Sequence, residues 1–219
     1  EKIVNAKDFP LTELSSTTSS EVTKVMENSY RAVNIAFIEE WARFAEAVGV
    51  NLFEVIEAIR KRPTHSNIRQ PGFGVGGYCL TKDPLFAKIS AQRLFEREDL
   101  QFPFCEQAVV INDAMPLVSL QKLESMLGGI KGKHIALFGI SYRQDVADTR
   151  FSPAKSFYST AIEKGAIMSV HDPLVEQWDE MGLKLDSKLP NAKILDAVVF
   201  AVAHREYREL DVAAWTNGS

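Results

Sequence analysis

Residues 134–173 read HIALFGISYRQDVADTRFSPAKSFYSTAIEKGAIMSVHDP, and this stretch decides the fold class of the chain. It contains two short apolar runs, HIALFGI and AIMSVH, on either side of a segment with helical spacing, SPAKSFYSTAIEKG. Two apolar runs separated by a helix are typical of a βαβ unit, in which the strands are parallel. We therefore expect residues 130–219 to form a Rossmann-like α/β domain around a parallel sheet.

Cap residues and a further apolar run support this interpretation. Ser152, Pro153 and Gly165 fit the N-cap, the first helical position and the C′ position of the crossover helix. The pattern then predicts a helix over residues 174–181, and the run AVVFAVAH at 197–204 predicts another strand of the same sheet.

The chain before this domain has helical periodicity instead. Residues 1–20 are polar and end in a Ser/Thr cluster, which predicts a connecting arm. Apolar residues then recur at helical spacing over 21–48, after the capping-box spacing of Thr18 and Glu21, and predict one long helix. Its apolar surface is wider than one packing partner covers, so we expect a homodimer through this helix. Residues 21–129 are thus expected to form a central all-helical dimerisation domain.

Composition excludes several classes of partner. The chain has 219 residues, 46% of them apolar, and a net charge of −4 with acidic and basic residues interspersed. Without an arginine-rich run or a basic stripe, we expect no nucleic acid partner. The apolar stretches are far shorter than the roughly 20 residues that span a bilayer, so we expect a cytoplasmic protein with no membrane partner.

The segment Gly72-Phe-Gly-Val-Gly-Gly77 matches the pattern G-x-G-x-x-G by letter only. The residues before it, RKRPTHSNIRQP, cannot form the buried strand that a dinucleotide fingerprint requires. The glycines are better explained by a close backbone approach to a ligand or to another segment. An ordinary flexible loop is the plainer alternative.

Two polar pairs near this loop could carry chemistry. Cys79 and Asp83 stand four residues apart with Lys82 between them, so a helix would place thiol and carboxylate on one face. A thiol near a helix N-terminus and a cation is suited to nucleophilic catalysis, whereas the alternative is a buried structural cysteine. Lys24 and Asn28 are also four apart in an otherwise apolar helix and could hold a developing oxyanion, unless they form a solvated helix face.

Residues 141–150 follow a strand and precede a capped helix, which is where parallel sheets bind phosphates and nucleotides. Arg143 and Arg150 are the fixed positive charges of this segment. Cys105 lies among apolar residues and is expected in the core. Four histidines are scattered without paired spacing, so we predict neither a metal site nor a histidine-based triad: His65, His134, His171 and His204.

These residues are specific enough to indicate a family. GFGVGGYCLTKDP closely resembles the catalytic-cysteine segment of the UDP-glucose and UDP-N-acetylhexosamine 6-dehydrogenases. EVTKVMENSYRAVNIAFIEE resembles the central dimer helix of this family, and FGISYRQDVADTRFSPA resembles its C-terminal UDP-binding domain. The resemblance covers roughly residues 15–210. Family members carry an N-terminal Rossmann domain for NAD, none of which is recognisable in the sequence, so we expect this chain to lack it.

The resemblance implies a reaction and a set of roles. The family oxidises the C6 alcohol of a UDP-sugar twice with NAD, through a thiohemiacetal and a thioester on the cysteine, before hydrolysis to the uronate. By position, Cys79 would be the nucleophile, Lys24 and Asn28 would stabilise the oxyanion, Asp83 would assist the hydrolytic water, and Arg150 would contact NAD. The substrate-binding residues implied are Asn67, Gly72, Gly74, Gly76, Gly77 and Arg143.

The sequence departs from the family in three places. Arg143 replaces a substrate-binding lysine, which keeps the charge and changes the donor geometry. Tyr78 stands where other members have histidine or serine, so the accepted hexose is not readable. An arginine that reaches the substrate of the neighbouring subunit has no clear counterpart near His65, and Arg62 is one candidate for that role.

Two other functions are consistent with parts of this pattern. One is a non-catalytic UDP-sugar-binding or dimerisation module, since the fragment without an NAD domain is expected to be inactive alone. The other is a 6-phosphogluconate- or hydroxyisobutyrate-type dehydrogenase, whose central helix also has a lysine and an asparagine four residues apart. Those enzymes use no catalytic cysteine and lack a second βαβ domain.

Overall fold

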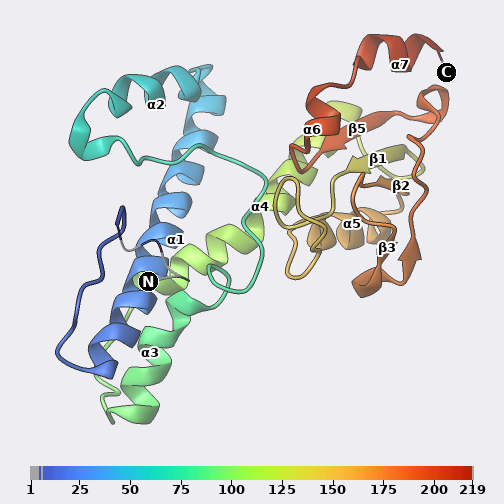
Figure 1. Cartoon of the computed structure of the whole chain (residues 1–219). Coiled ribbons are helices and arrows are strands. Elements are labelled where there is room, and N and C mark those ends of the chain that lie inside the picture. The colour runs from blue at the N-terminus through green and yellow to red at the C-terminus, as the bar shows by residue number, and fades with distance from the viewer. Residues whose placement is uncertain (1–4, 6, 219) are drawn as a thin grey trace.

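The computed structural model describes residue 5 and residues 7–218, which form a helical part and an α/β part (Figure 1). Residues 1–4 and 6 of the predicted arm lie outside the described residues. None of the described helices is long and apolar enough to cross a membrane. The main elements are α1 (Thr17–Val48), α2 (Leu52–Arg60), η1 (Pro63–His65), α3 (Asp83–Leu94), α4 (Pro103–Leu127), β1 (His134–Phe138), α5 (Ala154–Glu163), β2 (Ile167–His171), β5 (Ala197–Phe200), α6 (Arg205–Arg208) and α7 (Val212–Gly218).

The long helix α1 begins four residues before the predicted start. The predicted capping box at Thr18 and Glu21 is not used, because Ser16 is the N-cap and its hydroxyl accepts from the Ser19 backbone N–H at 3.1 Å. This arrangement satisfies one of the unpaired N–H groups of the first turn. The end of the helix agrees with the prediction, since Gly49 adopts the left-handed conformation with φ 71°.

Helix α4 joins the two parts of the molecule. Its N-terminal half packs against α1 through small side chains, Ala108 against Ala32 and Ala36. Its C-terminal half supplies Leu120 to the core of the α/β part, together with Phe157 on α5. Because one continuous helix belongs to both cores, the relative position of the two parts is fixed by packing.

The α/β part contains the predicted parallel sheet, with strand order β2-β1-β5. The chain runs from β1 to β2 on one side, and later returns to place β5 on the other side of β1. The crevice between the carboxyl ends of β1 and β5 is therefore a topological switch point, the place where open α/β sheets bind ligands.

The predicted helix over residues 174–181 is wrong. This stretch instead contains strand β3 (Gln177–Trp178) and the single turn η2 (Asp179–Met181), and β3 pairs antiparallel with β4 (Leu183–Lys184). The Trp178 side chain is fully buried and packs edge-on against Tyr158 of α5. Burial of this large ring decides the local structure over the helical spacing of a short segment.

Candidate functional site

The glycine-rich segment between α2 and α3 reaches across to the loop between β1 and α5 (Figure 1). A Cβ atom added to Gly76 would lie 2.3 Å from the carbonyl oxygen of Phe151 and 2.8 Å from Cβ of Tyr142. Gly77 has φ 79° and donates its N–H to the Arg150 carbonyl at 3.3 Å. The glycines therefore allow close approach to another segment, as one of the two sequence interpretations expected.

Two polar side chains anchor the same segment to the helices. The Gly72 N–H donates to Oε1 of Glu39 on α1 at 2.7 Å. Asn112 on α4 bonds the Val75 backbone in both directions, since its Oδ1 accepts from the N–H and its Nδ2 donates to the carbonyl, each at 2.8 Å. Burial raises the pKa of the Glu39 carboxyl, although the bond from Gly72 opposes that shift. Neither anchor was predicted, and the only signal for Asn112 is a polar residue within an apolar helix.

The predicted catalytic residues of α1 contact the turn at residues 79–83, the cysteine turn. Nζ of Lys24 lies 3.3 Å from Oδ1 of Asn28, and Nδ2 of Asn28 donates to Oδ2 of Asp83 at 2.6 Å. Asn28 is fully buried, so its amide orientation is fixed by these two partners. The burial of Asn28 excludes a wholly solvated helix face for this pair, although Lys24 itself is exposed.

Cys79 lies in the turn that leads into α3, not on the helix that the spacing suggested. Its carbonyl accepts from the Asp83 backbone N–H at 2.9 Å, and α3 begins at Asp83 itself. This one-turn bond still places the cysteine one helical turn before the carboxylate. Cys79 is exposed and free, so the alternative of a buried structural cysteine does not hold. Cys105 is only partly buried, which corrects its expected place in the core.

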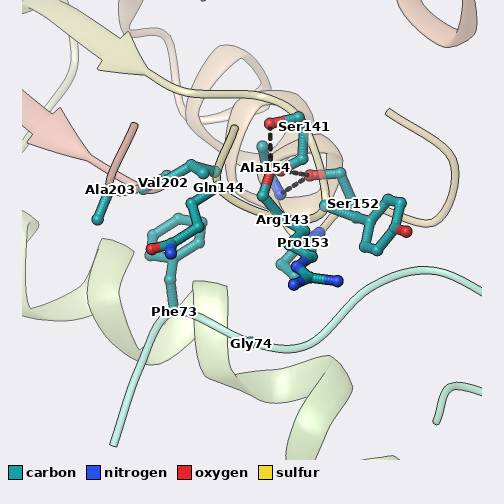
Figure 2. Close-up of a pocket in the computed structure, with 12 residues that line it drawn as sticks. Phe73, Gly74, Ser141, Arg143, Gln144, Ser152, Pro153, Ala154, Val202 and Ala203 are labelled. Carbon is teal, nitrogen blue, oxygen red and sulfur yellow. Dashed lines mark hydrogen bonds between the residues drawn. The ribbon is translucent and has the colours of Figure 1, made fainter. Parts of the chain in front are cut away.

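A pocket of about 190 Å³ occupies the switch point of the sheet (Figure 2). Arg143 and Gln144 contribute to it from the loop after β1, and Val202 contributes from the loop after β5. Figure 2 shows Phe73 and Gly74 of the glycine segment facing these loops. The pocket thus has walls from both parts of the molecule and a fixed cation, an arrangement that fits an anionic nucleotide.

Arg150 is paired with Asp148 at the edge of the cysteine turn. Its guanidinium donates to both carboxylate oxygens of Asp148, with the Nη2 to Oδ2 distance at 2.6 Å. This pairing keeps the pKa of the Asp148 carboxyl below its usual range. The guanidinium carbon also lies 5.0 Å from the ring centre of Tyr78, which packs edge-on against Phe151. The paired and stacked arginine therefore places a cation against Tyr78, the residue before Cys79.

The other predicted substrate contacts are divided between these places. Gly74 and Arg143 line the pocket, whereas Gly76 and Gly77 are buried against the loop after β1. Gly72 is exposed, and Asn67 points to α1, where its Nδ2 donates to the Tyr30 hydroxyl at 2.9 Å. Their roles in binding stay predictions.

One buried polar cluster was not predicted from the sequence. His204, Ser141 and Asp172 are buried together beneath the pocket, with Nε2 of His204 3.0 Å from the Ser141 hydroxyl and 3.2 Å from Asp172 Oδ2. All three follow carboxyl ends of strands, which was the available signal. Among the residues that the structure describes, no group of His, Cys, Asp and Glu side chains has an arrangement suited to a metal ion.

Comparison with known families identifies the class of protein, that of the nucleotide-sugar dehydrogenases. The family model for the central domain of the UDP-glucose/GDP-mannose dehydrogenases matches residues 18–114, and the model for their UDP-binding domain matches residues 136–218. The chain belongs to the UDP-glucose/GDP-mannose dehydrogenase family, of which it contains the central and UDP-binding domains.

Individual relatives agree with this assignment. The chain is 35% identical over 193 residues to the UDP-N-acetyl-D-mannosamine dehydrogenase of Methanocaldococcus jannaschii, covering 88% of this chain and 42% of that protein. It is 32% identical to the NDP-N-acetyl-D-galactosaminuronic acid dehydrogenase of Ralstonia solanacearum, covering 88% and 44% of the two chains. The solved NDP-N-acetyl-D-galactosaminuronic acid dehydrogenase of Methanosarcina mazei superposes with a TM-score of 0.82 at 28% identity, covering 92% and 44%. The chain therefore spans less than half the length of these relatives.

Proposed function

We propose that this chain supplies the catalytic cysteine and the UDP-sugar site of an NAD-dependent dehydrogenase that oxidises the C6 alcohol of the sugar to a carboxylate. Residues 21–129 would be its central domain and residues 130–219 its UDP-binding domain. The observation that carries this proposal is the chain of bonds from Lys24 through Asn28 to Asp83, which ends one helical turn from Cys79.

This arrangement fits an acyl-transfer mechanism on the cysteine. After a first oxidation of the alcohol to the aldehyde, the Cys79 thiolate adds to C6, and the former carbonyl oxygen takes up negative charge. Lys24 and the second amide proton of Asn28 are donors for that oxyanion. A second oxidation gives a thioester, and Asp83 then accepts a proton from the water that hydrolyses it and releases the thiol.

NAD would accept the hydride in each oxidation. The residues described here do not by themselves make a dinucleotide site, since the glycine segment follows no strand and packs against protein instead. Arg150 is the residue proposed to face the cofactor, as a clamped cation next to the cysteine turn.

The relatives suggest the class of sugar. Their names specify N-acetylated nucleotide sugars, and we extend this to a UDP-N-acetylhexosamine as the substrate of this protein. Thermal unfolding with UDP, UDP-glucose, UDP-GlcNAc and UDP-ManNAc compares the candidates, because a ligand that prefers the folded state raises the unfolding midpoint. A larger shift with UDP-glucose than with either N-acetylated sugar would contradict this choice.

The exposed apolar face of α1 supports a homodimer. Trp41 forms a ring cluster with Phe37 and Phe44, and all three side chains are about half exposed. Met26 and Val22 continue this face toward the start of the helix. An apolar stripe this long on an exposed helix is typical of a helix-mediated interface between subunits.

Alkylation of the two cysteines tests the catalytic proposal. We expect iodoacetamide to modify Cys79 rapidly and UDP-sugar to slow that reaction, because the ligand would cover the turn. Cys79→Ala in the full-length enzyme should abolish turnover while UDP still binds. Cys105→Ala is the matched control and should leave turnover unchanged. A Cys79→Ala enzyme that still produces the uronate, or a thiol that UDP-sugar does not protect, would overturn the proposal.

A further inference from the structure

The buried cluster around His204 lies directly under the loop that carries Arg143 into the pocket. Asp172 follows β2 and accepts three bonds through Oδ2, from the N–H groups of Ile140 and Ser141 and from His204 Nε2. His204 follows β5, and Ser141 follows β1. One cluster therefore ties together the carboxyl ends of all three parallel strands.

This cluster is not a hydrolytic triad. In a triad the serine and the carboxylate use different nitrogens of the imidazole. Here Ser141 and Asp172 both contact Nε2 of His204, and the serine side chain is fully buried. The Ser141 hydroxyl donates instead to the carbonyl of Arg143 at 3.0 Å.

The bond at Nδ1 of His204 shows which ring nitrogen carries the proton. Nδ1 lies 2.9 Å from the backbone nitrogen of Asp145, which can only donate. Nδ1 is therefore the acceptor, and the ring proton is on Nε2, where it faces Asp172 and Ser141. The Asp145 carboxylate is 3.8 Å from Nδ1, too far for a hydrogen bond, and its Oδ1 accepts from the Arg205 N–H at 3.0 Å.

These bonds hold the loop at residues 141–145 on both sides of the residues that line the pocket. The Arg143 carbonyl is bound by Ser141 before the turn, and the Asp145 N–H is bound by His204 after it. Asp145 has φ 57°, a left-handed conformation that a residue with a side chain adopts only when its surroundings impose it. Between the two anchors, Arg143 and Gln144 face the pocket.

We propose that His204 is a positioning residue for the nucleotide site, which holds the turn at residues 143–145 so that Arg143 and Gln144 meet the diphosphate of the substrate. This inference rests on the proposed function. The imidazole makes no contact with the ligand itself, because it is buried behind the loop.

Two substitutions at His204 separate its two bonds. In His204→Asn the side-chain oxygen takes the place of Nδ1 and can still accept from Asp145, while the donor to Asp172 is lost. In His204→Gln the amide takes the place of Nε2 and keeps that donor, while the Asp145 N–H loses its acceptor. Both variants leave one buried bond unmade, so both should lower the unfolding midpoint.

The measurements are UDP affinity by titration calorimetry and hydrogen exchange of the Asp145 amide. We expect His204→Gln to weaken UDP binding about tenfold, the effect of one lost hydrogen bond, and to speed exchange at Asp145. His204→Asn should bind UDP within about threefold of the natural protein and keep the amide protected. His134→Gln, at the amino end of the central strand β1, is the control and should leave affinity unchanged.

Each outcome decides between the explanations. If affinity falls equally in both His204 variants, in step with their unfolding midpoints, the histidine only stabilises the fold and the positioning role is wrong. If UDP binds the natural protein and neither variant weakens it, the positioning role fails while the proposed function stands. Absence of UDP binding to the natural protein overturns both. Should His204→Gln fail to fold, Ser141→Ala removes the tether on the Arg143 carbonyl together with the hydroxyl contact to His204, and it must weaken UDP binding for the proposal to survive.

Discussion

Gly76→Ala tests the contact that couples the cysteine turn to the nucleotide pocket. The added Cβ would lie 2.3 Å from the Phe151 carbonyl oxygen, about 1 Å inside the ordinary contact range that begins at 3.4 Å. The oxygen cannot move freely, because Phe151 has φ 54° and the neighbouring Arg150 carbonyl accepts from Gly77. Backbone must shift on one side or the other, and the hydrogen bond from Gly77 is the first to break.

Overpacking of this kind costs about 1–3 kcal/mol of stability. For a chain of this size each kcal/mol lowers the unfolding midpoint by roughly 2–4 °C, so Gly76→Ala should unfold about 2–12 °C below the natural protein. Because the clash separates the turn from the pocket, UDP should also protect Cys79 from alkylation less well than it does in the natural protein. Thermal unfolding and the alkylation rate with and without UDP measure the two effects.

Gly72→Ala is the matched control within the same segment. A Cβ on Gly72 meets no atom within 4 Å, and the residue does not have a left-handed φ. The substitution should therefore change stability by no more than about 0.5 kcal/mol and leave the protection of Cys79 intact. Equal unfolding midpoints for the two alanine variants would refute the close-approach explanation of the glycines.

Two further predictions concern α1. Burial raises the pKa of the Glu39 carboxyl above its ordinary value, so ionisation of this group lowers stability as pH rises through the ordinary carboxyl range. Glu39→Gln keeps an acceptor for the Gly72 N–H and should be more stable than the natural protein at neutral pH. That advantage should vanish near pH 4 in urea unfolding; an equal difference at both pH values would argue against it. Trp41→Glu places a charge in the exposed ring cluster and should shift sedimentation from dimer to monomer, whereas Glu40→Gln on the same helix should not. A dimer that survives Trp41→Glu would contradict an interface through this face of α1.

The sequence predicted the elements whose signal is local and repeated. The βαβ pattern of residues 134–173 predicted the parallel strands and α5, because two short apolar runs separated by a capped helix are compatible with few other folds. The C-terminal end of α1 at Gly49 followed from the rarity of left-handed residues other than glycine. Where the signal was weak, at residues 174–181, burial of Trp178 overrode helical spacing.

The candidate site was also predicted in part by local sequence patterns and decided in part by packing. The residue types and spacing of Lys24, Asn28, Cys79 and Asp83 predicted covalent chemistry, and the resemblance of three longer segments predicted the family. Only the tertiary structure brought Asn28 to Asp83 across 55 positions of the chain and placed the thiol in a turn ahead of α3. Such contacts depend on how helices pack, which no local pattern encodes.

The sequence by itself thus determined the class of fold and the family. The tertiary structure decided what the glycines approach, which polar groups anchor their segment, and that His204, Ser141 and Asp172 form one cluster. The physical reason is that secondary structure follows from periodicity over a few neighbouring residues, whereas a buried hydrogen bond between distant residues exists only where packing has removed both partners from water.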